Sequence, residues 1–190
     1  VVLLDLLLAT AEWHGGVLSV VTVDHGTRLG PGQGSADDAD FVEALATRQG
    51  LPVHRTSLGL GEGASEAACR EGRYAVFAAL DVDRVALAHH RRDQAETVLL
   101  ALLRGTGLSG LAAMRPRRGR YVRPLLGVPH ADLRAWADAR DLAWRADPTN
   151  DDNRYLRNRL RSRALPLLEA LRPGAVGAMA RSARHAAADE

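Results

Sequence analysis

Residues 84–104 read RVALAHHRRDQAETVLLALLR, and this stretch decides the fold class. Arg84–Ala88 is a short apolar run typical of a buried strand, and it leads directly into His89 and His90. Apolar residues then recur at helical spacing, which predicts a helix over Asp93–Arg104. A strand, a tight turn and a helix in this order form one half of a βαβ unit.

Strand-like and helix-like segments alternate along the rest of the chain. Strands are expected at Val17–Val23, Val53–Ser57 and Tyr121–Leu125, and helices at Asp37–Gln49, at Ser65–Leu80 and around Trp136. Short links between such segments predict an α/β fold with a doubly wound, mostly parallel sheet and helices on both faces. Ligands bind such sheets at the carboxyl ends of the strands, which is where Asp24-His25-Gly26 and His89-His90 lie.

The composition narrows the class of protein. The single cysteine, Cys69, excludes an internal disulfide framework and any Cys-x-x-Cys site within these residues. No stretch is long enough to span a membrane, so we expect a cytoplasmic protein without a membrane partner.

Arginine supplies every positive charge, and the net charge is only +2. The arginines gather in two stretches, Arg115, Arg117, Arg118, Arg120 and Arg123, then Arg154, Arg157, Arg159, Arg161 and Arg163. Guanidinium groups make paired hydrogen bonds to phosphate oxygens, so either stretch suits binding to a nucleic acid or a nucleotide. A solvated helix or loop face is the equally weighted alternative.

The segment His89–Glu96 is the first candidate site. Residues three and four apart on a helix are neighbours, so a histidine, Asp93 and Glu96 can converge. Imidazole and carboxylates together suit proton transfer, or Mg²⁺ coordination beside a phosphate. The alternative is a capping box with Asp93 as N-cap and Glu96 at N3, which leaves the two histidines unexplained.

Other segments are weaker candidates when each is taken alone. Asp24-His25-Gly26 brings a carboxylate and a glycine to the exit of a strand, with a simple turn as the alternative. Gly30–Gly34 lacks the Gly-Lys-Ser/Thr of a Walker loop and is expected to be a surface loop. Arg70 and Arg73 share a helix ridge with Tyr74, and a solvated ridge explains them equally well. A final helix with the second arginine stretch is expected to be interrupted by Pro166.

Seven segments taken in order resemble the tRNA(Ile)-lysidine synthetases, which belong to the N-type ATP pyrophosphatases or PP-loop family. They are Val23–Gly26, Arg70–Tyr74, His89–Thr97, Leu103–Leu111, Arg123–Leu126, Asp147–Asn150 and Arg157–Arg161. The resemblance implies a Rossmann-like, adenine nucleotide α-hydrolase-like fold over residues 1–172. The family's Ser-Gly-Gly-x-Asp-Ser phosphate loop is expected immediately upstream of Val1, and residues 173–190 are expected to begin a helical linker toward a further domain.

The resemblance also implies a reaction. The wobble cytidine of tRNA(Ile) with a CAU anticodon is adenylated by ATP with release of pyrophosphate, and free L-lysine then displaces AMP to give lysidine. ATP and Mg²⁺ are the expected cofactors, since cations offset the charge that develops on phosphate. Binding to a membrane is not expected, and a homodimer is left open.

Residue roles follow from the same resemblance. The catalytic group is expected to be His89, His90, Asp93 and Glu96. The cofactor-binding group is Asp24, His25, Gly26 and Arg73, with Asp24 and Asp93 as metal ligands. Arg70, Arg157, Asn158 and Arg161 are expected to face RNA or the adenylate. One position departs from the family, because many relatives have Asp-Asp-Gln where this chain has Arg92-Asp93-Gln94.

Two alternatives to this function remain. A related PP-loop enzyme that thiolates tRNA would share the histidine segment, but such enzymes typically use several cysteines. A non-catalytic nucleotide- or RNA-binding protein is the second, motivated by Arg92 and by the phosphate loop that is missing from these residues.

Overall fold

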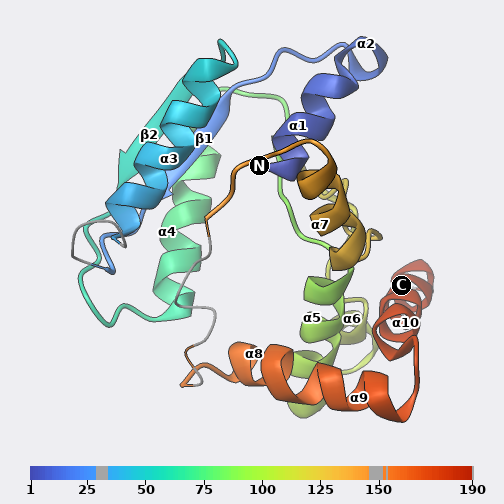
Figure 1. Cartoon of the computed structure of the whole chain (residues 1–190). Coiled ribbons are helices and arrows are strands. Elements are labelled where there is room, and N and C mark those ends of the chain that lie inside the picture. Colours follow the sequence, from blue (N-terminus) through green and yellow to red (C-terminus); the bar gives the residue numbers. More distant parts are fainter. Residues whose placement is uncertain (29–33, 146–151, 153, 190) are drawn as a thin grey trace. The chain divides into compact units, whose positions relative to one another are not determined.

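The computed structural model describes residues 1–28, 34–145, 152 and 154–189 (Figure 1). The chain divides into two compact units. The first consists of Val1 and Leu7–Val82, and the second of Val2–Leu6 and Asp83–Glu190.

The first unit is built on a parallel strand pair. Strand β1 (Val20–Asp24) pairs with β2 (Val53–Ser57), in a register that runs from Val20 opposite Val53 to Asp24 opposite Ser57. Helix α3 (Ser35–Arg48) connects the strands and lies along them (Figure 1). This arrangement is the βαβ unit that the alternation of segments predicts.

The remaining helices of the first unit are α2 (Ala11–His14), α4 (Glu66–Ala79) and the end of α1 (Val2–Ala9). Helix α4 begins as expected at Ser65, whose hydroxyl accepts a hydrogen bond of 3.1 Å from the Ala68 N–H. The buried core side chains of this unit are Thr22, Ala39, Ala46 and Phe77.

The predicted start of β1 at Val17 is wrong. The Val17 side chain is fully exposed, and the strand begins at Val20, whose N–H donates to the Pro52 carbonyl. Strand β2 begins only at Val53, so the residues before Val20 have no strand partner in this sheet.

The second unit holds a small mixed sheet of order β3-β5-β4. Strand β3 (Val85–Ala86) runs parallel to β5 (Tyr121–Val122), and β4 (Arg117–Arg118) is antiparallel to β5. The expected strand Tyr121–Leu125 is too long, because Pro124 has no N–H to continue the ladder. The chain turns there instead, with the Leu126 N–H donating to the Arg123 carbonyl.

Helix α5 (Arg91–Leu103) packs against α6 (Leu108–Leu111) and α10 (Ala175–Ala188), as Figure 1 shows. The core faces of α5 and α10 are formed by Ala95, Val98, Ala101, Ala175, Ala183 and Ala186. Leu102 and Leu103 continue the apolar pattern of α5 but are more than half exposed, so the sequence pattern overstates its buried face.

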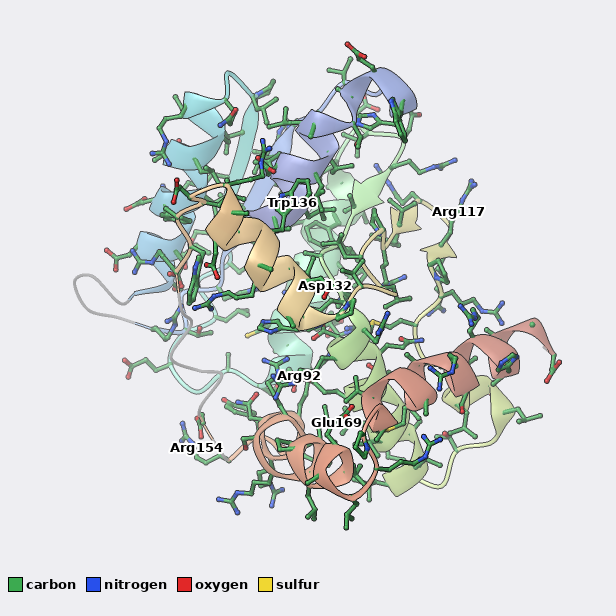
Figure 2. All side chains as sticks on the ribbon, turned by 45° about the vertical axis from the view of Figure 1, so that its right-hand side comes forward. Arg92, Arg117, Asp132, Trp136, Arg154 and Glu169 are labelled. Carbon is green, nitrogen blue, oxygen red and sulfur yellow. The ribbon has the colours of Figure 1, made fainter. Side chains whose placement is uncertain are left out.

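Helix α7 (His130–Ala139) carries Trp136, which is labelled in Figure 2. The indole N–H of Trp136 donates to Asp5 Oδ2 at 2.8 Å, and Arg140 Nε lies 2.8 Å from the same oxygen. This contact places the first turn of α1 in the second unit.

The last helical segment before α10 runs through α8 (Leu156–Arg159), a π-helical turn η2 (Leu160–Ala164) and α9 (Leu165–Leu171). Pro166 cannot donate to the preceding turn, and the α-helical pattern changes to π just before it, as an interruption at Pro166 predicts. Residues 175–188 form α10 within the second unit, and a further domain beyond them stays a prediction.

The predicted α/β class is confirmed. Strand pairs β1–β2 and β3–β5 are parallel, and β4–β5 is the antiparallel pair among the described strands. Within the described residues, no helix is both long enough and apolar enough to cross a membrane.

Candidate functional site

A buried glutamate organises the main candidate site, which lies in the second unit. Glu96 sits on the second turn of α5, and its side chain is 0% exposed. A buried carboxylate needs compensating charge, and two arginines supply it. Arg157 Nε donates to Glu96 Oε2 at 2.8 Å, while Arg161 donates through Nε to Oε1 at 2.7 Å and through Nη2 to Oε2 at 3.1 Å.

Asp93 stands one turn earlier on the same face of α5. Its Oδ1 lies 3.4 Å from Arg161 Nη2 and 3.7 Å from Arg157 Nη2. The two carboxylates therefore face the same two guanidinium groups. We call His90, Asp93, Glu96, Arg157 and Arg161 the Glu96 cluster.

The start of α5 differs from the predicted capping box. His90 is the N-cap and Asp93 is at N3, where Asp93 Oδ2 accepts the His90 N–H at 2.8 Å. The expected box, with Asp93 as N-cap and Glu96 at N3, is wrong because the N-cap lies three residues earlier, at His90, and the helix begins at Arg91. Helix capping thus accounts for the contact of one Asp93 oxygen. Glu96 takes no part in the cap and binds the two arginines instead.

His90 is held on two sides. Its Nδ1 lies 3.3 Å from Asp93 Oδ2, and its ring packs edge-on against His130 with the ring centroids 5.2 Å apart. Burial lowers the pKa of His90 from its ordinary value; the Asp93 charge opposes this shift, and His130 adds to it. The shift favours the neutral imidazole, which is the form that can accept a proton.

The second candidate site lies in the first unit, at the carboxyl end of β1. Asp24 Oδ1 accepts the Gly26 N–H at 2.8 Å, and Oδ2 accepts the Ser57 hydroxyl at 3.4 Å. A hydrogen bond from Ser35 is the main cause that lowers the pKa of Asp24, followed in the same direction by the Gly26 and Ser57 bonds against the opposing effect of burial. Asp24 is therefore a stable anion at the strand end.

Glycine is required at position 26. Gly26 has φ of +66°, and a Cβ there would stand 3.1 Å from the Cα of Gly59. The chain segments after β1 and β2 thus approach each other closely, and hydrogen bonds from Leu58 to the Asp24 carbonyl and from Leu60 to the His25 carbonyl extend the pairing.

His25 follows Asp24 into this turn. Burial is the main cause that lowers the pKa of His25, and the charge of Arg73 adds to the effect while Asp24 opposes it. Arg73 thus acts electrostatically on His25 from α4. Arg70 on the same helix stacks over the Tyr74 ring, with 5.0 Å from its guanidinium carbon to the ring centroid.

The structure brings together only some of the predicted site residues. His90, Asp93, Glu96, Arg157 and Arg161 meet in one cluster, and His25 and Arg73 interact in the other unit. His89 is half-buried at the end of the segment after β3. Asn158 donates to the Asp152 carbonyl at 3.0 Å and so supports the backbone before α8. The predicted turn Asp147–Asn150 and most of the loop Gly30–Gly34 lie outside the described residues.

Several motif residues prove to be structural. Gln94 is buried and bonds to both backbone groups of Met114, donating to its carbonyl at 2.9 Å and accepting its N–H at 3.1 Å. Buried Arg123 donates to the Arg115 carbonyl at 2.9 Å. Gly72 lets α4 approach Leu58, since a Cβ there would stand 2.6 Å from Leu58 Cδ1. Sequence reasoning missed His130 altogether, because only the fold brings it against His90.

A magnesium ion fits this chain only if a bound substrate supplies part of its coordination shell. Both oxygens of Glu96 are taken by guanidinium groups, and the described residues contain no cluster of three or more carboxylate, histidine or cysteine side chains suited to a metal. Mg²⁺ commonly takes one or two carboxylates and completes its shell with substrate phosphates and water. Asp24 and Asp93 can each supply one such oxygen.

A family model described as the PP-loop domain matches residues 1–168. The chain belongs to the PP-loop family. ATP binding follows from this membership, as the resemblance in the sequence implies. The PP-loop domain here contains both candidate sites, the strand-end turn at Asp24 and the Glu96 cluster.

Curated relatives cover the same PP-loop domain. The chain is 44% identical over 191 residues to the tRNA(Ile)-lysidine synthase of Solibacter usitatus, covering 97% of this chain and 43% of that protein. It is 42% identical to the tRNA(Ile)-lysidine synthase of Polaromonas naphthalenivorans, over 96% of this chain and 58% of that protein. It is 46% identical to the tRNA(Ile)-lysidine synthase of Thermobifida fusca, over 86% of this chain and 51% of that protein. The chain thus spans about half the length of the curated relatives it matches.

A solved structure shares the fold of this PP-loop domain. It is the U34-tRNA thiolase NcsA from Methanococcus maripaludis, solved with its 4Fe-4S cluster. The TM-score is 0.70 at 16% identity, over 97% of this chain and 67% of that one. At this identity the likeness speaks for the α/β fold alone.

Proposed function

We propose that this chain is the ATP-using part of a tRNA(Ile)-lysidine synthase. In this reaction the wobble cytidine of tRNA(Ile) with a CAU anticodon is adenylated, and free lysine then displaces AMP. The observation that carries the proposal is identity of 42–46% to proteins of that name over 86–97% of the chain. The convergence of two family motifs, His89–Thr97 and Arg157–Arg161, on one buried cluster supports it.

Within the Glu96 cluster, we assign different tasks to the two carboxylates. Glu96 is a positioning residue, because it is fully buried and both its oxygens hold arginines. Its role is to fix Arg157 and Arg161 where they can bind the phosphate or the adenylated base. Asp93, with His90 beside it, is the group proposed to act on the reacting atoms, and His89 next in the chain is proposed to assist it. Neutral His90 is suited to take the proton that the lysine amine loses when it attacks.

In the first unit, Asp24, His25, Gly26 and Arg73 are the proposed nucleotide-side residues, and Arg70 is a further RNA or adenylate contact. Asn158, in the second unit, is proposed as another such contact. The tight Gly26 turn exposes backbone at a strand end, where nucleotides bind in such folds. Asp24 and Asp93 are the proposed Mg²⁺ ligands. Mg²⁺ at either carboxylate would neutralise charge on the ATP phosphates. A cytoplasmic location and a homodimer are further parts of the proposal.

The test is Asp93→Asn in the full-length protein. Asparagine still accepts the His90 N–H, so the cap of α5 survives and the variant should unfold within about 1 kcal/mol of the wild type. The anionic charge is lost, and ATP–pyrophosphate exchange in the presence of tRNA should fall below detection. Asp132→Asn, an exposed aspartate on α7 (labelled in Figure 2), is the control for loss of one negative charge and should exchange normally.

Mass spectrometry of the tRNA separates the competing functions. Lysidine at the wobble position supports the proposal. Sulfur in place of oxygen would favour a thiolase instead, and absence of pyrophosphate exchange by the wild-type full-length protein would contradict any enzymatic role. Normal lysidine formation by Asp93→Asn would show that the catalytic carboxylate lies elsewhere.

A further inference from the structure

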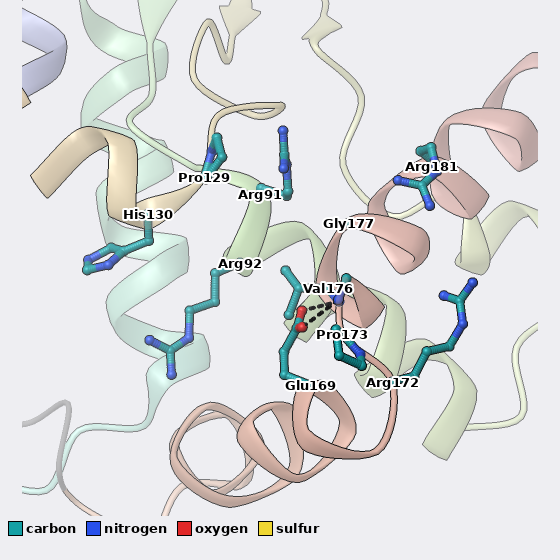
Figure 3. Close-up of a pocket in the computed structure, with 11 residues that line it drawn as sticks. Arg91, Arg92, Pro129, His130, Glu169, Arg172, Pro173, Val176, Gly177 and Arg181 are labelled. Carbon is teal, nitrogen blue, oxygen red and sulfur yellow. Dashed lines mark hydrogen bonds between the residues drawn. The ribbon is translucent and has the colours of Figure 1, made fainter. Parts of the chain in front are cut away.

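A pocket in the second unit lies beside the Glu96 cluster and is not part of it. It has a volume of about 430 Å³ and is formed by the start of α5, the start of α7 and the junction of α9 with α10. Its polar and charged lining residues are Arg91, Arg92, His130, Glu169, Arg172 and Arg181 (Figure 3). Four guanidinium groups therefore share this pocket with a single carboxylate.

The four arginines are not neutralised by other side chains. Among the described residues, none of them has a carboxylate oxygen within 4.0 Å. Arg91 Nε donates to the Gly127 carbonyl at 2.8 Å, and Arg92 Nη2 donates to the Arg161 carbonyl at 2.6 Å. Carbonyl groups orient a guanidinium without cancelling its charge, so both arginines are held in place as cations.

The single carboxylate is held by backbone groups. One oxygen of Glu169 accepts the Gly174 N–H and the other accepts the Val176 N–H, each at 2.8 Å, as the dashed lines in Figure 3 show. The Val176 and Gly174 bonds lower the pKa of Glu169, which therefore stays charged. That charge faces the positive end of the α10 dipole. One carboxylate against four guanidinium groups leaves the pocket with a net positive charge.

The positions of the arginines indicate the shape of the ligand. Arg91 and Arg92 come from α5, Arg172 from the α9–α10 junction and Arg181 from the first half of α10. Figure 3 shows that their guanidinium groups point in different directions around the pocket. Convergent guanidiniums would suit one small anion. Dispersed ones suit an extended polyanion that passes along the pocket.

The pocket also adjoins the Glu96 cluster directly. Arg92 is bonded to the backbone of Arg161, and His130 packs against His90 with ring centroids 5.2 Å apart. A phosphate chain in the pocket would therefore lie next to the residues assigned to the reaction.

We propose that this pocket binds the sugar–phosphate backbone of the RNA substrate, through Arg91, Arg92, Arg172 and Arg181. The inference rests on the proposed function, since it takes the tRNA as the polyanion. It gives Arg92 a task that an aspartate at this position could not perform. Arg92 is then both a phosphate ligand and an anchor for the Arg161 backbone.

The test compares two double variants of the full-length protein. Arg172→Gln with Arg181→Gln removes two exposed pocket arginines, while Arg104→Gln with Arg184→Gln removes two exposed arginines outside the pocket. Binding of a labelled RNA stem-loop with a CAU loop is followed by fluorescence anisotropy over a series of KCl concentrations. Thermal unfolding establishes that both variants keep the wild-type fold.

The pocket variant should bind the RNA about fivefold to tenfold more weakly. Its slope of log affinity against log salt should flatten by about 0.7 for each phosphate that an arginine no longer neutralises. The control variant should stay within about twofold of the wild type. Equal affinities and slopes for the two variants would overturn the proposal.

A second arm distinguishes the source of the phosphate. Inorganic pyrophosphate is titrated against both variants. If the pocket variant binds pyrophosphate more weakly but binds RNA as the wild type does, the site belongs to the free anion and the RNA proposal is overturned. Failure of the proposed function is seen separately. A wild-type protein that makes no lysidine, but whose RNA binding responds to the pocket variant as described, contradicts the function and leaves the pocket assignment standing.

Discussion

Replacing Glu96 by glutamine tests whether this residue holds the Glu96 cluster together. Glutamine has nearly the same shape but no charge, and its amide nitrogen would face an arginine donor where an acceptor stood. Arg157 and Arg161 would still face the carboxylate of Asp93, at 3.7 and 3.4 Å. The protein therefore loses the main counter-charge of two partly buried guanidiniums without losing volume.

The expected cost follows from burial. Removing one partner of a fully buried ion pair costs about 3–5 kcal/mol. The Arg157 and Arg161 side chains are 21% and 26% exposed and can turn partly toward water. We therefore expect a loss of about 3 kcal/mol, or roughly 6–12 °C in the melting temperature of a chain of this size.

The measurement is urea unfolding of the wild type and of Glu96→Gln, with Glu71→Gln as an exposed control on α4 that should stay within about 0.5 kcal/mol. Combining Glu96→Gln with Arg161→Gln should cost less than the sum of the single changes, because the second change removes an arginine left without its partner. A loss below about 1 kcal/mol for Glu96→Gln would refute the view that this carboxylate holds the arginines in place.

Three further predictions concern other parts of the fold. Gly26→Ala should destabilise the first unit more than Gly50→Ala does, because both glycines have positive φ but only Gly26 meets backbone, at 3.1 Å from Gly59; calorimetry that ranks them equally would contradict this. Gln94→Glu should lower the free energy of unfolding by about 2 kcal/mol, because a carboxylate cannot donate to the Met114 carbonyl. The same change at the exposed Gln49 should lower it by less than about 1 kcal/mol, and equal urea midpoints for the two variants would be incompatible with the Gln94 contacts. Glu169 has a lowered pKa, so its charge stabilises the folded protein fully above the ordinary glutamate pKa of 4.5, and this stabilisation is lost as the pH falls through the lower pKa of the folded state. Glu169→Gln should therefore flatten the acid side of a plot of unfolding free energy against pH, and an unchanged plot would argue against the cap of α10.

The sequence predicted well the features that depend on neighbouring residues. The parallel pair β1–β2, the cap of α4 at Ser65 and the helix after His90 all follow from local periodicity and capping chemistry. Strand lengths were overestimated where pairing depends on a distant partner. Strand β3 spans only Val85–Ala86, because its partner β5 stops at Val122, just before the turn at Pro124.

The Glu96 cluster could be predicted only in part. The family resemblance singled out its members, while local reasoning left Asp93 and Glu96 open between a site shared with a histidine and a capping box. The bonds from Arg157 and Arg161 to Glu96 join residues 61 and 65 positions apart, which no local pattern reveals. One signal was present, since a glutamate between Ala95 and Val98 lies near the buried face of α5 and requires a positively charged partner.

The free energy needed to bury the charges of the Glu96 cluster indicates why the fold keeps them. An ion pair in the interior is commonly no more stabilising than apolar side chains of similar volume, because both charges must leave water. A core made for stability alone could place leucine at position 96 and at both arginine positions. Glu96 instead has no exposed surface, and its two oxygens fix the Nε atoms of Arg157 and Arg161, the latter also tied to Arg92 through its carbonyl. We infer that the fold keeps these charges for the orientation they impose, because two guanidiniums fixed before a phosphate arrives lose little freedom when it binds.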